Sequence, residues 1–429
     1  MAADSTGYRA PVSLAHRHVL AVLLGNGLEF YDFLAYSFFA LQIGRAFFPS
    51  HNPLSSLLLS LATFGAGFLT RPVGAWAIGR FADRTGRRPA MMLTFILMGT
   101  AILGVALTPS YASIGVAAPV LVVFWRLLQG FALGGEVGPT TAFLIEAAPP
   151  ARRALYGSLQ NATQGVATLF AGIVGVALTA FIDPAALDSW GWRCAFLLGA
   201  TVVPVGLFIR RTLPETLHVP AMIVESHALS ERSYLRPVLL GLCMLTAATM
   251  ATYVRTYMTT YAVATLGFSS HVAFVTTMLN GVANALAVVT GGWLADRVGR
   301  RPVMIAGGSV LTLCTLPVFI AITHFRTPSV LYSGIVVLAI MSGFAMAPLL
   351  ALITESLPRR IRAGAMGTMY AVAVSVFGGS TQFLVAWLIG ITGSALVPGW
   401  YSAVAALLGL VAVIAARETA PAIAISRAA

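Results

Sequence analysis

The chain has 429 residues, of which 58% are hydrophobic and 9% charged, and its mean hydropathy is +0.87. A soluble domain carries about 25% charged residues, so this composition excludes an ordinary soluble protein and indicates an integral membrane protein. All 26 basic residues are arginine, which excludes chemistry that needs a lysine, such as a Schiff base or a phosphate-binding P-loop.

Apolar runs of about 20 residues or more, the length that crosses a bilayer, recur along the whole chain. Residues 1–18 are polar and lack the apolar core and cleavage site of a signal peptide, so we expect the first run to be retained. The runs predict an all-α integral membrane protein with twelve transmembrane helices, at residues 19–47, 54–80, 89–108, 113–146, 153–181, 191–210, 237–266, 270–295, 302–324, 328–355, 361–391 and 397–417.

Arginines lie almost entirely in alternate connections between the predicted spans. They gather in both tails and after the even-numbered spans, whereas the other connections contain only Arg45, Arg193 and Arg326. Cytoplasmic loops carry the excess of basic residues in membrane proteins. We therefore expect a multi-pass protein of a bacterial inner membrane with both termini in the cytoplasm. This distribution accounts for the net charge of +12 and argues against nucleic acid as a partner.

The two halves of the chain repeat each other. The segment FADRTGRRP at 81–89 recurs as LADRVGRRP at 294–302, and LIEAAPPARRALYGS at 144–158 matches LITESLPRRIRAGAMG at 352–367. Nearly the same number of residues separates the members of each pair, which indicates a duplicated six-helix unit. Transporters built from such repeats hold their substrate between the two units, near the middle of the membrane.

The longest polar connection separates six predicted spans from the other six. The predicted units are a cytoplasmic N-terminal tail (1–18), an N-terminal six-helix bundle (19–210), a central cytoplasmic loop (211–236), a C-terminal six-helix bundle (237–417) and a cytoplasmic tail (418–429).

Several motifs together resemble those of a known transporter family. The repeated Asp-Arg-x-Gly-Arg-Arg-Pro loops are similar to the signature of the major facilitator superfamily. Other motifs resemble those of its metabolite:proton symporter family: GNGLEFYDF (25–33), GFLTRPVGA (67–75), RLLQGFALGGEVG (126–138), SLQNATQG (158–165) and WGWR (190–193). Within that family the chain resembles the citrate and tricarballylate carriers most, and the late stretches 276–305 and 377–400 are similar to the citrate carriers in particular. The resemblance follows the motif order over nearly the whole chain. It implies the major facilitator fold, with two pseudo-symmetric six-helix bundles that work by alternating access.

Three acidic residues, Glu29, Asp32 and Glu136, fall within predicted spans. A charged side chain at the bilayer centre costs about 2.5–3.5 kcal/mol on insertion scales, so such an acid needs a cavity, a partner or a proton. The seven histidines all fall at span ends or in loops. We therefore predict that one of the three acids carries the co-transported proton. The alternative for each is a structural hydrogen bond within the bundle.

Three arginines lie well inside predicted spans, away from the span ends: Arg71, Arg126 and Arg255. A guanidinium group binds a carboxylate through two parallel hydrogen bonds. We predict that Arg126 and Arg255 hold substrate carboxylates and that Arg71 forms a structural ion pair. Pairing of Arg126 with an acid of the first span is the alternative. Arg255 departs from the citrate carriers, where this position is small or apolar.

Polar side chains on other spans complete the predicted site. The residues expected to orient the substrate are Asn26, Gln160, Gln164, Asn280, Asn284 and Tyr257. Gln160 and Gln164 are one helical turn apart, as are Asn280 and Asn284, so each pair shares a helix face. The alternative for all of them is helix bridging or packing.

The repeated loops have a different predicted role. The resemblance implies that the aspartate of each loop contacts a neighbouring helix end and clamps the transporter closed. A carboxylate near a helix N-terminus is favoured by about 0.3–1 kcal/mol. The predicted gating residues are Asp83, Arg84, Arg88, Asp296, Arg297 and Arg301. A merely solvated, positively charged loop is the alternative.

These features predict a proton-coupled symporter that imports a small organic anion, a di- or tricarboxylate such as citrate. The predicted partners are that anion, protons and the lipid bilayer, and we expect a monomer without cofactor or metal. The alternatives are a symporter of a zwitterion such as proline or betaine, a symporter of a monocarboxylate such as shikimate, and a membrane substrate sensor. We do not expect an enzyme, because the sequence offers no metal cluster, nucleophile elbow or phosphate loop.

Overall fold

A computed structural model describes residues 23, 26–27, 30–31, 33–85, 87–134, 144, 148–201, 204, 232–358 and 362–420. The side chains of residues 82, 83, 87, 88, 91, 150, 232, 233 and 363 lie outside the description. All regular elements in these ranges are helices, as the sequence predicts.

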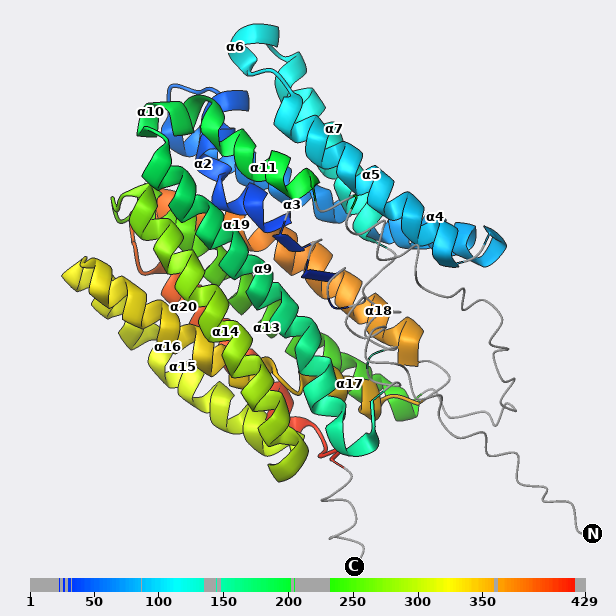
Figure 1. Ribbon diagram of the computed structural model, residues 1–429. Coiled ribbons are helices and arrows are strands. Elements are labelled where there is room, and N and C mark those ends of the chain that lie inside the picture. The colour runs from blue at the N-terminus through cyan, green and yellow to red at the C-terminus, as the bar shows by residue number, and fades with distance from the viewer. Residues whose placement is uncertain are drawn as a thin grey trace, which may run out of the picture.

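Among the described residues, the first half of the chain contributes nine labelled α-helices (Figure 1). They are α2 (Ala40–Phe47), α3 (Pro53–Leu69), α4 (Arg71–Thr85), α5 (Arg87–Leu107), α6 (Tyr111–Ile114), α7 (Ala117–Leu133), α9 (Arg153–Phe181), α10 (Pro184–Ala186) and α11 (Trp192–Ala200). A 3₁₀ turn at Pro150–Arg152 precedes α9, and a π-helical turn, Leu187–Gly191, precedes α11. Residues 33–38 are also helical and lead into α2.

The second half contributes eight labelled α-helices among the described residues. They are α13 (Arg232–Ala264), α14 (Ser270–Val298), α15 (Arg300–Phe325), α16 (Pro328–Met346), α17 (Leu349–Ser356), α18 (Arg362–Val372), α19 (Gly379–Thr392) and α20 (Val397–Ala415). A π-helical turn, η3 (Ala373–Gly378), joins α18 to α19.

Eight helical stretches of the described chain are long and apolar enough to cross a membrane, and two shorter apolar helices, Met92–Leu107 and Ala117–Leu133, accompany them. Nine of these ten match predicted spans to within a few residues, and the exception is Ala117–Leu133. The fourth predicted span is longer than its helix, because α7 ends at Leu133 and α6 is a separate turn.

Three predicted spans contain interruptions that periodicity does not reveal. The second span divides into α3 and α4, and the tenth into α16 and α17. Pro72 and Pro348 lie at these two breaks, where proline lacks the N–H that would continue the helical hydrogen bonds. The eleventh span contains η3, and such π-helical turns are frequent at functional sites.

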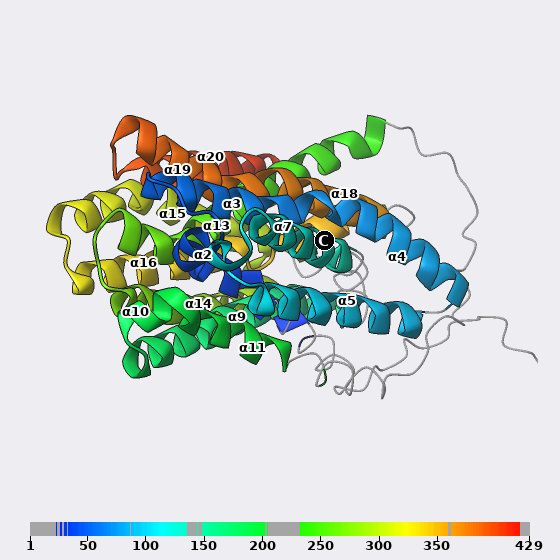
Figure 2. The same cartoon turned by 90° about the horizontal axis from the view of Figure 1, so that it is seen from above.

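The two halves meet along a tight seam between α9 and α14 (Figures 1 and 2). Glycines permit this approach: a Cβ atom on Gly281 would lie 2.3 Å from the backbone nitrogen of Leu169, and one on Gly172 would lie 2.6 Å from that of Met278. Membrane helices lack a strong hydrophobic drive to associate, so small residues that let backbones approach are the usual solution.

A second seam joins α3 to α19 (Figure 2). Here a Cβ atom on Gly65 would lie 2.4 Å from the carbonyl oxygen of Gly379. Beside this seam the Ser37 hydroxyl and the Gln382 amide are hydrogen-bonded at 2.7 and 2.9 Å, both buried. The Thr260 hydroxyl donates to the Ser37 carbonyl at 3.3 Å, so helices of both halves share one buried polar cluster.

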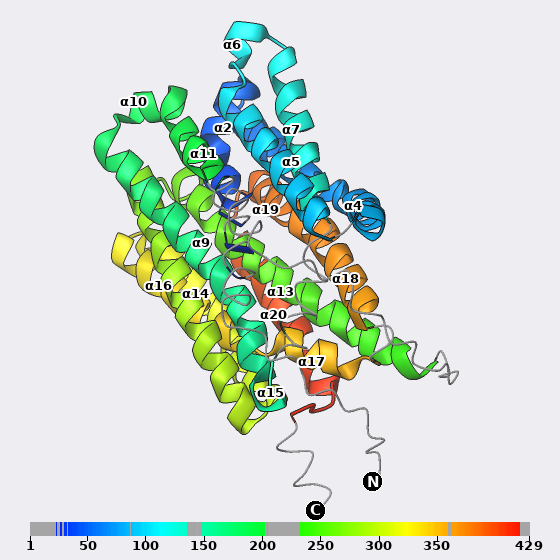
Figure 3. The ribbon, with the colours of Figure 1, turned by 45° about the vertical axis from the view of Figure 1, so that its right-hand side comes forward.

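The bundle has two distinct ends. One end, which we term the arginine-rich end, carries Arg84, Arg153, Arg297, Arg300 and Arg301 at helix termini. The small helix α17 lies toward this end, whereas α6 and α10 lie at the opposite end (Figures 1 and 3).

Candidate functional site

A cavity with an empty volume of about 600 Å³ lies between the two halves. Its lining from the first half is Phe30, Phe33, Leu34, Asn161, Gln164, Gly165 and Thr168. Its lining from the second half is Thr252, Tyr253, Arg255, Thr256, Asn280, Gly281, Asn284, Val288 and Met346. The lining residues 161–168 come from the middle of α9 and the lining residues 280–288 from the middle of α14, so the cavity is at mid-height of the bundle, where the repeat plan predicts a substrate site.

Arg255 brings a buried cation to this cavity. Its side chain is 8% exposed, and its Nη1 and Nη2 atoms donate to the hydroxyls of Ser342 at 2.5 Å and Thr252 at 3.4 Å. The Nε atom is buried without a hydrogen-bond partner among the described residues, and none of their carboxylates pairs with Arg255. A buried charge costs several kcal/mol unless it is paired, so this arrangement suits an anion that enters the cavity.

Four amide side chains surround the same cavity. Asn161 and Gln164 come from α9, and Asn280 and Asn284 come from α14 on the facing side. Asn280 is 8% exposed, and its Oδ1 atom is buried without a hydrogen-bond partner in the described chain. The structure therefore brings together three amides that the sequence predicts for the site and adds Asn161.

Two other predicted ligands lie beside the cavity rather than in its lining. The Asn26 Nδ2 atom donates to the Gln160 carbonyl at 3.3 Å and to the Thr163 hydroxyl at 2.7 Å, which ties the first helical segment to α9. The Gln160 side chain is 2% exposed. These contacts match the helix-bridging alternative, and a substrate contact by either residue stays a prediction.

Tyr257 is also absent from the lining. It is 1% exposed and lies in an apolar cluster that includes Tyr261, with ring centroids 6.4 Å apart. Tyr253 lines the cavity instead. On a helix with 100° per residue, Tyr253 lies closer than Tyr257 to the face shared by Arg255, Thr252 and Thr256, and this spacing is the signal that distinguishes the two tyrosines.

Arg126 lies within the first half and does not line the cavity. Its guanidinium carbon is 4.2 Å from the ring centroid of Tyr36, 5.2 Å from that of Phe64 and 5.3 Å from that of Phe33. Its Nη1 atom donates to the Gln129 side chain. Cation–π contacts of this kind are worth about 2 kcal/mol when desolvated. Substrate binding by Arg126 stays a prediction.

Arg71 lies over the same aromatic group from the other side. Its guanidinium carbon is 4.4 Å from the ring centroid of Phe68 and 5.2 Å from that of Phe33. The described residues place aromatic faces, and no carboxylate, against Arg71. Its predicted structural ion pair stays a prediction.

The three predicted proton-carrying acids, Glu29, Asp32 and Glu136, lie outside the described residues. In the sequence, Phe30 directly follows Glu29 and Phe33 directly follows Asp32, and both phenylalanines line the cavity.

Asp296 connects the two halves at the arginine-rich end. Its Oδ1 and Oδ2 atoms accept hydrogen bonds from the backbone N–H groups of Ala154 at 3.0 Å and Leu155 at 2.9 Å. These are unpaired donors of the first turn of α9, so the carboxylate acts as a helix cap supplied by the other half. This contact has the form that the gating prediction requires.

Three further charged residues, Arg300, Glu355 and Arg153, lie at this connection, and the site prediction does not include them. Arg300 is fully buried; it lies 2.5 Å from Glu355 and 3.8 Å from Asp296. Arg153, at the start of α9, lies 3.5 Å from the other oxygen of Glu355. Arg300 falls inside the repeated loop motif, and Glu355 falls inside the second repeat, so the duplication was the available signal.

The remaining predicted gating residues make contacts within their own half or lie outside the description. The Arg297 guanidinium carbon lies 3.9 Å from the Trp293 ring on the same helix. Arg301 donates to the carbonyl oxygens of Val413 and Ile414 at the end of α20. Arg84 is exposed, and the side chains of Asp83 and Arg88 lie outside the description. A gating role for these five residues stays a prediction.

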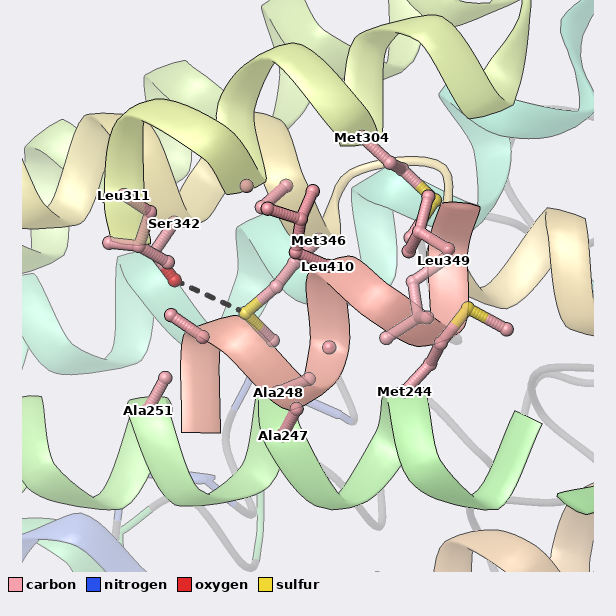
Figure 4. A pocket seen from close by; sticks show the side chains of 15 residues that line it. Met244, Ala247, Ala248, Ala251, Met304, Leu311, Ser342, Met346, Leu349 and Leu410 are labelled. Carbon is pink, nitrogen blue, oxygen red and sulfur yellow. Dashed lines mark hydrogen bonds between the residues drawn. The ribbon is translucent and has the colours of Figure 1, made fainter. Parts of the chain in front are cut away.

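A separate apolar pocket of about 460 Å³ lies inside the second half, against α13 (Figure 4). Met244, Met304 and Met346 contribute thioethers to its wall, and the Ser342 hydroxyl donates to the Met346 sulfur at 3.4 Å. Ser342 thus separates this pocket from Arg255. Because the pocket lacks a charged side chain, it does not suit an organic anion.

Comparison with known proteins places the chain in a family. The model of the family described as "Sugar (and other) transporter" matches residues 18–227 and 223–424. The chain belongs to this family. The match covers both halves, which agrees with the internal repeat and with the predicted membership of the major facilitator superfamily.

Relatives and solved structures extend this result. The chain is 35% identical over 404 residues to the citrate-proton symporter of Salmonella typhi, which covers 92% of each chain. It is 35% identical to the alpha-ketoglutarate permease of Escherichia coli K12, over 84% of each chain, and 30% identical to a proline/betaine transporter of Salmonella typhimurium, over 94% of this chain and 83% of that protein.

A structure of the xylose transporter from E. coli, in a partially occluded inward-open conformation, superposes with a TM-score of 0.72. It is 16% identical and covers 93% of this chain and 96% of that one. The fold is therefore the twelve-helix major facilitator fold, and the chain is a multi-pass membrane transporter rather than an enzyme.

Proposed function

We propose that this transporter is a proton-coupled symporter of a small organic anion, a di- or tricarboxylate such as citrate, in a bacterial inner membrane with both termini in the cytoplasm. The citrate-proton symporter and the alpha-ketoglutarate permease support a carboxylate substrate. The arginine distribution supports the orientation. In this orientation the arginine-rich end faces the cytoplasm.

The observation that carries the proposal is Arg255, which is only 8% exposed and faces a cavity between the halves. Ser342 and Thr252 orient its Nη atoms without neutralising its charge. A carboxylate supplies both the missing charge and two acceptor oxygens in the geometry of the guanidinium fork. Amides on α9 and α14 face the rest of the substrate.

Coupling to protons follows from the acids of the first and fourth predicted spans. A protonated carboxyl group near the cavity does not repel an anionic substrate, whereas an ionised one does. Loading a proton on Glu29, Asp32 or Glu136 would therefore favour substrate binding, and release of the proton on the other side would favour substrate release. Asp296 would keep the cytoplasmic ends together until that release.

A zwitterion remains the competing substrate class, because a proline/betaine transporter is among the relatives. A quaternary ammonium group is usually held by aromatic faces, and Tyr253, Phe30 and Phe33 line the cavity. The uncompensated cation at Arg255 opposes it, since a ligand with a fixed positive charge would bring a second cation into the cavity.

The deciding experiment is uptake of radiolabelled citrate, succinate and betaine into proteoliposomes, with and without an inward proton gradient. We expect the uptake of a carboxylate to increase with the gradient. We also expect Arg255→Met to lower that uptake by at least about tenfold, equivalent to about 1.4 kcal/mol. Arg326→Met is the matched control, because Arg326 is exposed and its Nε atom donates to the Thr323 carbonyl of its own helix end. Equal carboxylate uptake with and without the proton gradient would refute the proposal, and so would uptake of betaine without uptake of any carboxylate.

A further inference from the structure

The cavity presents one polar atom that a carboxylate cannot satisfy. Asn280 Oδ1 is a hydrogen-bond acceptor, buried at the cavity wall, with no donor among the described residues. Ionised carboxylates only accept hydrogen bonds. They can match the donors of Arg255, but they leave Asn280 Oδ1 without a partner.

An unsatisfied buried acceptor is costly, because it has lost its bonds to water and gained none. Exchanging the oxygen and nitrogen of the amide leaves a buried donor unpaired instead. A hydroxyl group can form a hydrogen bond with the amide in either orientation, because it donates through its hydrogen and accepts through its oxygen. Among the groups of a small organic acid, the hydroxyl is therefore the one that fits Asn280 in both orientations, whereas an ionised carboxylate fits only the exchanged one.

The two polar groups belong to one cavity. Arg255 on α13 and Asn280 on α14 line the same cavity, each 8% exposed. Thr252 and Ser342 already occupy both Nη atoms of Arg255 as acceptors, and no equivalent protein contact occupies Asn280 in the described chain. The wall therefore carries one anion-binding group and one group that requires a donor.

We infer that the transported anion is a hydroxylated polycarboxylate and that Asn280 is the residue that recognises its hydroxyl. This inference rests on the proposed function and narrows it: among acids with the same carboxylates, those that also carry a hydroxyl are preferred. A site built around such a hydrogen bond rejects the analogue that lacks the hydroxyl, because the protein group is then left unpaired in a desolvated place.

The test compares ligand pairs that differ only in the hydroxyl: citrate with tricarballylate, and malate with succinate. Their dissociation constants are measured by titration calorimetry on the purified full-length protein, at about pH 8, where carboxyl groups of ordinary pKa are ionised and cannot act as donors. We expect the hydroxylated member of at least one pair to bind about tenfold or more tightly.

Two variants locate the effect. Asn280→Leu, which keeps the size of the side chain but removes its polar group, is expected to bring the ratio of the two dissociation constants in a pair to about one. Asn284→Leu, one turn further along α14 in the same cavity wall, is expected to weaken both ligands and keep the ratio. A wild-type ratio of one in both pairs overturns the inference while leaving carboxylate transport intact, and so does an unchanged ratio in Asn280→Leu. If no carboxylate binds, the proposed function fails, and the inference fails with it.

Discussion

Asp296 Oδ1 accepts a hydrogen bond from the backbone N–H of Ala154 at 3.0 Å, although the two residues lie 142 positions apart in the chain. The contact joins the last turn of α14 to the first turn of α9, and so joins the two halves at the arginine-rich end. Because a helix N-terminus carries partial positive charge, it holds a carboxylate without needing a particular side chain. Such a contact suits a latch, and its breaking and re-forming as the halves move stays a prediction.

Replacing Asp296 with alanine is expected to favour separation of the two halves at this end. Loss of a helix cap costs about 0.5–2 kcal/mol, and one or two kcal/mol changes a two-state ratio by about 5–30-fold. The measurement is the distance distribution between spin labels at Arg152 and Val298. The control is Glu418→Ala, because Glu418 accepts from the backbone of Arg300 and Arg301 within one half. An identical shift in both variants would contradict the latch.

The stability of the protein is expected to depend strongly on both members of the Arg300–Glu355 pair. Removing one member of a buried ion pair costs about 3–5 kcal/mol, whereas replacing both with apolar groups is often neutral. We expect Arg300→Met and Glu355→Leu each to lower the thermal unfolding temperature in detergent. The double variant should be more stable than the sum of the single losses predicts. Additive losses would show that the two side chains act independently, through Asp296 and Arg153 for example.

At the α9–α14 seam, one added methyl group is expected to lower the stability of the protein. Gly281→Ala would place a Cβ atom 2.3 Å from a backbone nitrogen of α9, and overpacking of this kind costs about 1–3 kcal/mol. Gly79→Ala is the matched control, because Gly79 lies in α4 and its added Cβ position meets no atom of another described element within 4 Å. We expect Gly281→Ala to unfold at a lower temperature and to transport poorly. Gly79→Ala should be unchanged or slightly stabilised. Equal behaviour of the two variants would contradict the packing explanation.

Ser342 is expected to act as a positioning residue for Arg255. Removing its hydroxyl in Ser342→Ala leaves the guanidinium held by Thr252 alone, at 3.4 Å. Loss of one hydrogen bond to a charged group is worth about 1.5–3 kcal/mol, so the KM for carboxylate uptake should rise about tenfold or more. The control is Ser333→Ala on the exposed face of α16. An unchanged KM, with transport otherwise normal, would show that Arg255 needs no support from α16.

Much of the fold follows from one-dimensional patterns. Span length, arginine distribution and the internal repeat depend on local composition, because each helix must satisfy its backbone hydrogen bonds within itself inside the bilayer. The predicted span 153–181 coincides with α9, and 270–295 falls within α14. The breaks at Pro72 and Pro348 were visible in the sequence as proline residues, but proline is tolerated in membrane helices, so it does not by itself locate an interruption.

The site was less predictable than the spans. The predicted polar residues divide between the cavity wall, which includes Gln164, Asn280 and Asn284, and helix contacts, which include Asn26 and Gln160. Residue type does not distinguish a bridging amide from a ligand-binding one. Only the helix rotation and the neighbour opposite decide that, and both are set by packing.

The sequence by itself determined that this is an arginine-biased, duplicated helical membrane transporter, because hydrophobic length and charge asymmetry act residue by residue. Only the tertiary structure decided that Arg255 faces a cavity without a paired carboxylate among the described residues, that Asn280 keeps an unsatisfied acceptor beside it, and that Asp296 caps a helix of the other half. Each of these facts concerns which groups lie opposite one another across helices distant in sequence. That relationship arises from the close packing of α9, α13 and α14 and is absent from any single helix.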